Sequence, residues 1–360
     1  MLTPIRAWVE LIHHLDAHDW PLRHAAGEVP GRTPFGIDEL ARHGIEVAFR
    51  QVYSGPVTRR VTRLVRERAG GVEWAEAVLA GPCAQRRHAD VVLCWDEFTG
   101  IPAAALSRLP GGPPVVSGVQ LLSDPAGRSA GFVRRARAAL RRMDAVFVQA
   151  AGMVPVLREE WGVPAAKLHL VRFGVDADWF RPTAAGIDRD LVVSVGDDPH
   201  RDHDTLIAAM TAVRSRRPAA RLELATQLDV RFPADIGTLH RGHLGPRRRR
   251  FYGEAAVVAV ATRPNAHGSG MSVILEAMAC GRPYVVTASR GLDGYLRDGE
   301  DGLVVPPGDV DALAAAVEKL LADPDRADAM GAAGRARLER ELTTDVQAAH
   351  LAAVIHSVAS

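Results

Sequence analysis

The most chemically informative stretch of the sequence is a glycine loop that runs into an apolar helix pattern, between His267 and Pro283. The loop ends at Gly270 and Met271, and we expect Ser272 to open the helix and cap it. The first N–H groups of a helix have no acceptor within the helix, so they can hold a phosphate. The segment therefore predicts a phosphate-binding loop.

Glu276 lies four residues after Ser272, which places the two side chains on one face of the expected helix. A carboxylate there is poorly suited to a diphosphate, but it can accept hydrogen bonds from both hydroxyls of a ribose. The pair therefore predicts a nucleotide. The alternative for these two residues is a capped surface helix without a ligand.

A second segment, from Gly196 to Leu206, has the pattern of a tight loop that enters an amphipathic helix. Arg201 lies near the start of that helix, where a guanidinium can bind diphosphate oxygens and stabilise a departing nucleoside diphosphate. The alternative is an ordinary solvated arginine. Asp197 and Asp198 are adjacent rather than spaced, as is common in turns, so we expect no metal site and no cofactor.

These candidate residues lie among short β-branched runs that alternate with helical patterns, which is typical of α/β proteins with doubly wound parallel sheets. The expected strands are 22–26, 45–52, 90–95, 114–119, 145–149, 168–173, 191–195, 221–225, 255–261, 283–287 and 302–305. The expected helices are 37–42, 57–68, 72–87, 132–142, 154–161, 204–213, 272–280, 310–322 and two more within 326–358, broken near Thr343.

A small, polar, aperiodic stretch after Pro182 has the composition of a linker. It predicts two Rossmann-like domains, 1–182 and 183–340, followed by a C-terminal helix at 341–360 that packs back towards the first domain. Ligands of open α/β sheets bind beyond the carboxyl ends of the strands, so we expect the two domains to face each other across a cleft that holds the site.

The composition excludes several other classes of protein. The 360 residues carry a formal net charge of +1, so no global field draws the chain to nucleic acid or to an anionic membrane. The three cysteines are too few for a disulfide framework, and no signal-peptide core or transmembrane span is evident. We therefore expect a cytoplasmic protein that binds no nucleic acid.

Several motifs together resemble family 4 of the retaining glycosyltransferases (glycosyl transferases group 1), which have the GT-B fold. The motifs are Phe173-Gly-Val-Asp176, Phe180-Arg-Pro182, Leu275-Glu-Ala-Met-Ala279, Gly281-Arg-Pro283, Asp298-Gly-Glu-Asp-Gly302 and Val305-Pro-Pro-Gly-Asp309. The resemblance is good over residues 140–340, whereas the first 110 residues match only in outline.

The resemblance implies roles for the C-terminal candidates. Glu276 matches the family glutamate that binds the donor ribose, and Arg201 matches the basic residue that faces the diphosphate. The backbone of Gly270, Met271 and Ser272 matches the segment along the donor sugar and phosphate.

Two further positions complete the donor side. Gly196 and His267 are expected to lie against the donor, and the alternative for His267 is an ordinary loop histidine.

The first domain is expected to bind the acceptor. Gly31 to Gly36 corresponds to a glycine-rich turn that the family places after its first strand. Asp96 and Gln120 each follow a predicted strand, and the alternative for Asp96 is a helix cap. An arginine-rich helix from Arg134 to Arg142 is expected to pack its apolar stripe on the sheet, although some family members dock such helices on anionic membranes.

Three positions depart from the family pattern. Gly268 stands where the family usually has the first glutamate of E-x7-E, Asp197 replaces a frequent arginine, and Gln120 replaces a frequent histidine.

The resemblance implies transfer of a hexosyl or related sugar from a nucleoside-diphosphate sugar to an acceptor hydroxyl. The implied mechanism is metal-independent attack on the front face, with the acceptor proton passing to the diphosphate. The alternatives are an epimerase or phosphorylase on the same fold, or a non-catalytic nucleotide-sugar-binding partner protein.

Overall fold

The computed structural model describes residues 3–51, 55–80, 83–107, 112–123, 125–183 and 186–359. The chain divides into two compact units. Unit 1 comprises Met1–Ala25, Gly31–Arg172 and Gln347–Ser360, and unit 2 comprises Ala26–Pro30 and Phe173–Val346.

The chain enters unit 2 at Phe173, nine residues before Pro182, after which the linker was expected. The reason is that residues 173–182 pack with the second core. Val175 forms a bridge with Thr343, and Phe180 is buried with its ring 6.3 Å from that of Tyr252.

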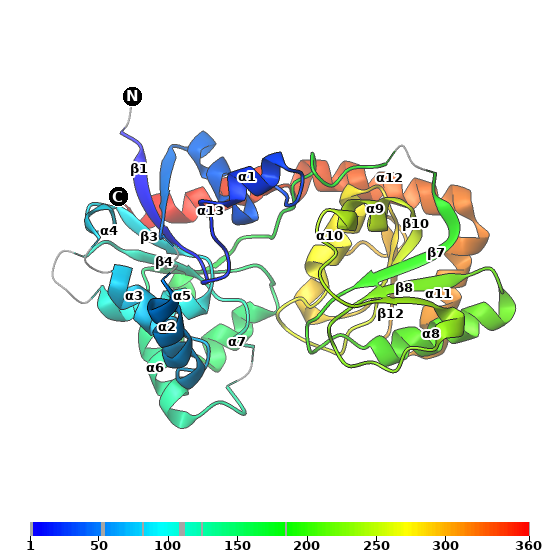
Figure 1. Cartoon of the computed structure of the whole chain (residues 1–360), viewed down its shortest axis with the longest axis horizontal. Helices are drawn as coiled ribbons and strands as arrows, with labels where there is room; N and C mark the ends of the chain where they lie inside the picture. The colour runs from blue at the N-terminus through cyan, green and yellow to red at the C-terminus, as the bar shows by residue number, and fades with distance from the viewer. Residues whose placement is uncertain are drawn as a thin grey trace. The chain divides into compact units, whose positions relative to one another are not determined.

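Unit 1 contains a six-stranded parallel sheet in the order β2-β1-β3-β4-β5-β6. The strands are β1 (Ile5–Glu10), β2 (Ile45–Phe49), β3 (Val91–Cys94), β4 (Val115–Gly118), β5 (Ala145–Val148) and β6 (Leu168–Leu170). The helices are α1 (Trp20–Ala25), η1 (Pro34–His43), α2 (Pro56–Arg68), α3 (Trp74–Ala80), α4 (Ala84–Arg87), α5 (Glu97–Leu106), α6 (Ala130–Leu140), α7 (Met153–Glu159) and η2 (Ala165–Lys167). Figure 1 shows α2, α3, α5 and α6 on one side of this sheet.

The expected first strand at 22–26 is wrong, because that segment is the helix α1, and the strand lies earlier, at Ile5–Glu10. The charges that interrupt the apolar run of β1 are satisfied by partners far away in the sequence. Arg6 pairs with Asp90 at 3.0 Å, and the fully buried Glu10 pairs with Arg86 at 3.1 Å. Nothing local in the sequence signals these pairs.

Helix α5 was not expected from the sequence, since Gly100 and Pro102 weaken its helix pattern. The glycine is required by packing, because a Cβ at Gly100 would lie 1.9 Å from the Ser117 hydroxyl on β4. The expected helix at 72–87 is observed as α3 and α4, and its residues 81–82 lie outside the described residues, as does Val52 at the end of the expected strand 45–52.

Unit 2 contains a second six-stranded parallel sheet in the order β12-β11-β10-β7-β8-β9. The strands are β7 (Asp188–Val195), β8 (Arg221–Ala225), β9 (Gly237–His240), β10 (Ala255–Val260), β11 (Tyr284–Thr287) and β12 (Gly302–Val305). The helices are α8 (His203–Arg216), η3 (Ala234–Ile236), α9 (Arg247–Gly253), α10 (Met271–Ala279), η4 (Arg290–Leu292), α11 (Val310–Ala322) and α12 (Pro324–Glu341). Helices α8 and α11 cover one face of this sheet, and α9, α10 and α12 cover the other (Figure 1). The expected α/β architecture with two Rossmann-like layers is confirmed; the short edge strand β9 was not expected.

The chain ends in α12 and α13 (Thr344–Val358), which are separated near Thr343 as expected. From Gln347 onwards α13 belongs to unit 1, where the Gln347 side chain donates to the Phe35 carbonyl at 3.0 Å. The return of the C-terminal helix to the first unit is therefore confirmed. In the part of the chain that the structure describes, no helix is both long enough and apolar enough to cross a bilayer.

A buried ion pair fixes α12 to the rest of unit 2. The Arg337 guanidinium lies 2.6 Å from Asp301 and donates to the carbonyls of Tyr295 and Gly294 at 2.8 and 2.9 Å. Asp301 also accepts from the Tyr284 hydroxyl on β11. This cluster joins α12 to β11, which follows directly after α10 in the chain.

Replacing Arg337 with alanine is expected to lower the free energy of unfolding by about 3–5 kcal/mol, because Asp301 is left buried without its counter-charge. Urea unfolding of the full chain measures the change. Arg340→Ala is the matched control: Arg340 lies on the same helix, and its side chain is 62% exposed beside Glu341, so a loss of at most about 1 kcal/mol is expected. Equal losses in the two variants would contradict a special role for the buried pair.

Candidate functional site

The glycine loop of unit 2 leads into α10 through a left-handed residue. Gly270 is the N-cap of α10 with φ 91°, and no side chain caps the helix. The prediction that Ser272 opens and caps the helix is wrong: the left-handed turn at Gly270 starts the helix one residue earlier, and Ser272 is an exposed residue of its first turn. The Met271 amide donates to the Gly268 carbonyl at 2.9 Å, and the amides that follow it in the first turn lack acceptors within the helix, so phosphate binding here stays a prediction.

Arg201 lies beside this loop as a buried cation, only 3% exposed. Its guanidinium donates to the Val195 carbonyl, while its Nη1 has no hydrogen-bond partner in the described part of the chain. Burial lowers the pKa of Arg201 to about 10, so the group remains charged at neutral pH. A buried, incompletely paired guanidinium is well suited to an anionic ligand.

Two glycines make room for this guanidinium. A Cβ at Gly196 would lie 2.1 Å from Arg201 Nε, and a Cβ at Gly270 would lie 2.9 Å from Arg201 Nη1. Both glycines also have positive φ angles, 158° and 91°, although only the second lies well inside the left-handed region. The structure thus brings Gly196, Arg201 and the start of α10 together, as the sequence predicted for one site.

Asn265 holds the loop before α10 in shape. Its side-chain oxygen accepts from the amides of Gly268 and Ser269, both at 2.9 Å. Gly268 has φ 81°, and a Cβ there would lie 2.7 Å from the Gly291 carbonyl oxygen. A glutamate at this position, as in the family pattern, does not fit this loop, and the departure at Gly268 follows from the backbone.

Glu276 is buried on α10, 5% exposed, and lies 3.3 Å from the Arg248 guanidinium. Burial raises the pKa of Glu276, while Arg248 and Tyr252 oppose that rise. Arg248 also lies over the Phe180 ring at 5.2 Å. From the sequence, Arg248 is expected to be one of a run of solvated arginines, and no local signal marks it, because its partner Glu276 is 28 positions further along the chain.

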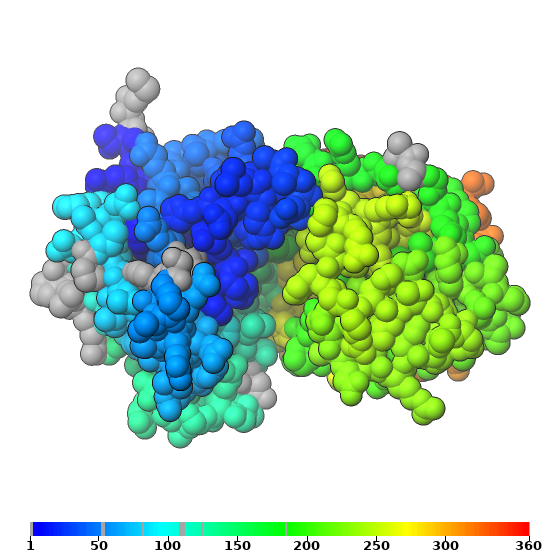
Figure 2. Space-filling model, in the orientation of Figure 1, coloured from blue at the N-terminus to red at the C-terminus, as the bar shows by residue number. Residues whose placement is uncertain are grey.

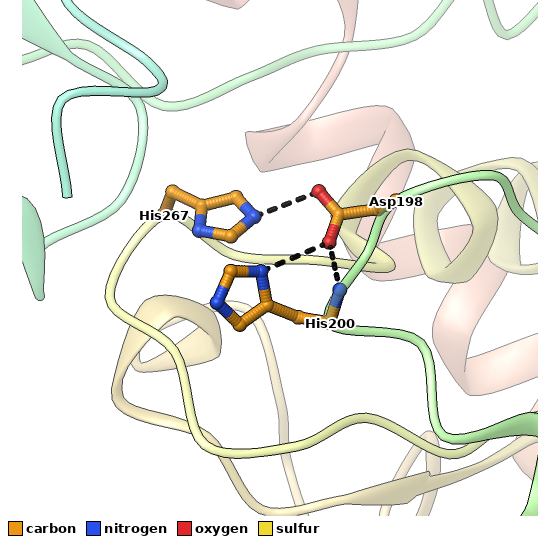
Figure 3. A group of neighbouring side chains, drawn as sticks. All are labelled: Asp198, His200 and His267. Atoms are coloured by element: carbon orange, nitrogen blue, oxygen red, sulfur yellow. Dashed lines mark hydrogen bonds and ion pairs between the residues drawn. The ribbon is translucent and has the colours of Figure 1, made fainter. Parts of the chain in front are cut away.

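His267 is oriented by a carboxylate from another loop. Its Nε2 lies 2.8 Å from Asp198, and its Nδ1 is buried without a partner in the described residues. Figure 3 shows that the Asp198 carboxylate faces both the His267 ring and the His200 ring, and His200 Nδ1 lies 3.3 Å from it. Burial on its own would raise the pKa of Asp198, but the hydrogen bonds from His267 and the His200 amide hold it well below the usual range.

The same three side chains are the group in the described residues whose atoms could ligate a metal. One ligand atom from each of Asp198, His200 and His267 lies within 4.8 Å of the others. Imidazole and carboxylate groups suit zinc and similar ions. The Asp198 carboxylate already accepts hydrogen bonds from His267 and from the His200 amide. The expected absence of a metal stays a prediction. The one sequence signal for this group is that His200 lies two positions after Asp198.

The three acceptor-side candidates lie in η1 (Gly36), at the N-cap of α5 (Asp96) and after β4 (Gln120), and contacts of neighbouring residues link these segments. Asp96 accepts from the amides of Phe98 and Thr99 at 2.9 and 3.2 Å, so it caps α5. Burial and the adjacent Glu97 raise the pKa of Asp96 to about 7. Glu97 in turn accepts from the Gln120 amide at 2.9 Å.

Gly36 lies in η1 with φ 65°, beside Phe35, whose ring stacks on Trp95 at 4.3 Å. The expectation that this turn follows the first strand is wrong, since it follows α1. Gly36, Asp96 and Gln120 nevertheless belong to one end of the unit 1 sheet, because Trp95 and Gln120 follow β3 and β4.

Two compact units, each built on a six-stranded parallel sheet with flanking helices, are the architecture of the GT-B class of glycosyltransferases. Comparison with known families agrees with that class. Residues 6–179 match Glycosyltransferase Family 4, and residues 189–323 match Glycosyl transferases group 1. The chain belongs to glycosyltransferase family 4.

Among curated relatives, a GDP-mannose-dependent alpha-(1-6)-phosphatidylinositol monomannoside mannosyltransferase of Mycolicibacterium smegmatis is 35% identical over 197 residues, which is 48% of this chain and 52% of that protein. A glycogen synthase of Mycobacterium tuberculosis is 31% identical over 69% of this chain and 64% of its own length. The chain thus spans about half the length of the mannosyltransferase that it matches.

Solved structures share the fold at lower identity. Sucrose-phosphate synthase from Thermosynechococcus elongatus has a TM-score of 0.72 at 20% identity, covering 98% of both chains. Anabaena HepE in complex with UDP-glucose has a TM-score of 0.71 at 14% identity, covering 98% of this chain and 99% of that one.

Asp198→Asn is expected to lower the free energy of unfolding at pH 7 by about 1–2 kcal/mol, the size of a partly exposed charge-assisted hydrogen bond. The low pKa of Asp198 in the folded state means that its ionised form stabilises the fold above the unfolded pKa of about 3.9. This contribution is lost as pH falls below that value.

Denaturant unfolding of both proteins between pH 7 and pH 3 measures the effect. The difference between wild type and Asp198→Asn is expected to shrink towards the acid end. A difference that is constant with pH would mean that the carboxylate charge is not what stabilises the loop.

Proposed function

We propose that this chain is a retaining glycosyltransferase that moves a hexosyl or related sugar from a nucleoside-diphosphate sugar to an acceptor hydroxyl. The observation that carries the proposal is the buried Arg201 guanidinium, whose Nη1 lacks a partner in the described residues and lies against Gly270 at the start of α10. A fixed cation and a helix N-terminus at one point form a diphosphate site. Unit 2 is accordingly the donor-binding unit.

The other residues of unit 2 complete the donor site in this proposal. Glu276 accepts hydrogen bonds from the ribose hydroxyls, and the Arg248 guanidinium at 3.3 Å opposes the rise in the pKa of Glu276 that burial causes. His267, oriented by Asp198, offers its buried Nδ1 to a hydroxyl of the donor sugar. The backbone of Gly270, Met271 and Ser272 lies along the phosphates.

Bond breaking in this mechanism is assisted by fixed charge. As the glycosidic bond breaks, negative charge develops on the diphosphate, and Arg201 and the α10 dipole stabilise that charge. The acceptor hydroxyl attacks the same face of the sugar and gives its proton to a diphosphate oxygen, so the anomeric configuration is retained. No general base is required, which fits Gln120 in the place of a histidine.

Unit 1 is the proposed acceptor unit, with Gly36, Asp96 and Gln120 at the carboxyl end of its sheet. Phe132 and Leu140 of α6 are buried, so any membrane contact of this helix would rely mainly on its exposed arginines. The cysteines are all free, which is consistent with the proposed cytoplasmic location.

The names of similar proteins suggest which nucleoside-diphosphate sugars to assay as donors. Several curated mannosyltransferases that match this chain are named GDP-mannose-dependent, whereas HepE was solved with UDP-glucose. GDP-mannose and UDP-glucose are therefore the first donors to assay. Substrate-dependent sugar transfer to an added acceptor distinguishes the proposal from an epimerase, a phosphorylase or a non-catalytic binding protein.

Glu276→Gln is expected to weaken binding of the active nucleoside diphosphate roughly tenfold to hundredfold, because two charge-assisted hydrogen bonds to the ribose become neutral ones. Isothermal titration calorimetry with GDP and UDP measures this. Glu318→Gln, on the surface helix α11, is the control and is expected to bind as the wild type does. Unchanged affinity in Glu276→Gln would remove Glu276 from the donor site.

The transfer reaction is expected to proceed at full rate in the presence of EDTA and to give a product with the donor's anomeric configuration, since Arg201 supplies the charge that a metal would otherwise supply. Product NMR and rates with and without chelator test both points. Activity that falls with EDTA and recovers with zinc or manganese would instead place a catalytic metal at Asp198, His200 and His267.

A further inference from the structure

Unit 1 contains a cavity of about 690 Å³ that the donor site does not use. Its lining is strongly basic, because five of the lining residues are arginines: Arg50, Arg59, Arg60, Arg63 and Arg66. Two histidines, His13 and His14, also line it, and Glu76 is the one carboxylate among the described lining residues. Helix α2, which carries four of the arginines, lies at the surface of unit 1 shown in Figure 2.

The cavity lies at the functional end of the sheet. His13 and His14 follow β1, and Arg50 follows β2 directly. The carboxyl ends of parallel strands are where open α/β sheets bind ligands. Since β1 pairs with β3, the cavity lies next to the strand that leads to the acceptor-side candidate Asp96.

The buried anchor of the cavity is Arg50, which is 7% exposed. One of its nitrogens, Nη2, donates to Glu73 and to the Leu11 carbonyl at 2.5 and 2.6 Å. The other, Nη1, is buried and has no hydrogen-bond partner among the described residues. A desolvated N–H of a charged group without an acceptor is costly unless a ligand supplies one.

The remaining arginines are only partly neutralised. Arg66 pairs with Glu76 at 2.8 Å, and Arg63 lies 3.5 Å from Glu67 in an exposed pair. For Arg59 and Arg60, the described part of the chain provides no ion pair. The cavity therefore retains excess positive charge on α2.

This arrangement is unfavourable for α2 by itself. Arg59 and Arg63 are four residues apart and Arg60 and Arg63 three apart, so like charges adjoin on one helix face. A bound anion removes this repulsion and satisfies Arg50 Nη1 at the same time.

We propose that this cavity binds the phosphate group of the acceptor, so that the acceptor substrate of this chain is a phosphate ester with a free hydroxyl. Arg59 and Arg60 supply the free cations, and Arg50 supplies the buried donor. That the bound phosphate ester is an acceptor substrate rests on the proposed transferase function. The existence of the anion site does not depend on that function. The phosphate could belong to a soluble sugar phosphate or to a phospholipid headgroup, because both present the same anionic oxygens to arginine.

The test measures anion binding by the full chain with the unit 2 site filled by saturating GDP or UDP. The soluble probe is glycerol 3-phosphate, titrated at constant ionic strength. The lipid probe is sedimentation with vesicles of phosphatidylcholine alone and of phosphatidylcholine mixed with phosphatidylglycerol.

The double variant Arg59→Gln, Arg60→Gln removes the two free cations, and both side chains are exposed, so the fold is expected to survive. The matched control is Arg68→Gln, Arg87→Gln, which makes the same charge change at exposed residues of unit 1 outside the cavity lining. We expect at least a roughly tenfold loss of affinity for the phosphate probe in the first variant and none in the second. GDP or UDP binding is expected to be the same in all three proteins.

Each outcome decides between the alternatives. Binding of glycerol 3-phosphate that depends on Arg59 and Arg60 supports a soluble ester, and vesicle binding alone with the same dependence supports a headgroup. Equal binding of both probes by the two double variants, or no binding of either probe by wild type, overturns the proposal. If GDP and UDP fail to bind while the probe still binds through Arg59 and Arg60, the anion site stands and the transferase function fails.

Discussion

The desolvated guanidinium of Arg201 is the constraint around which unit 2 is organised. Removing a guanidinium from water is costly unless hydrogen bonds and counter-charge compensate it. The protein provides one carbonyl, that of Val195, and burial lowers the pKa of Arg201 to about 10. Close packing against it requires glycine at positions 196 and 270, which in turn gives α10 its left-handed entry and its open N-terminus. A diphosphate would supply the missing counter-charge.

In the loop before α10, backbone packing excludes a side chain at position 268. Gly268 approaches the Gly291 carbonyl so closely that no side chain fits, so a glutamate cannot occupy the place it has in the family pattern. The adjacent His267 is instead held by Asp198, and its other ring nitrogen is left without a partner in the described residues. A carboxylate only accepts hydrogen bonds, whereas an imidazole can also donate one. A contact made by His267 therefore selects for different sugar groups from a contact made by a glutamate.

Unit 1 also buries charged groups, among them carboxylates. Glu97 is fully buried and is satisfied by the amides of Gln120 and Leu121, which fixes the loop after β4. Its charge also helps raise the pKa of Asp96 to about 7. Near this acidic region, Arg50, which follows β2, and the arginines of α2 line a cavity of the opposite sign. A substrate with a hydroxyl and an anionic group matches such a division of charge.

Local periodicity, glycine positions and motif spacing encode three features of this protein: the alternation of strands and helices, the break between α12 and α13, and the grouping of Gly270, Arg201 and Glu276. Tertiary structure alone decided which charged residues could be buried. The strand β1 carries Glu10, which is tolerated only because Arg86 lies beside it, and Arg248 gains its role only from Glu276 on another helix. The same holds for the pairing of Asp198 with His267. Such pairs join residues tens of positions apart, and no local pattern encodes a partner at that distance.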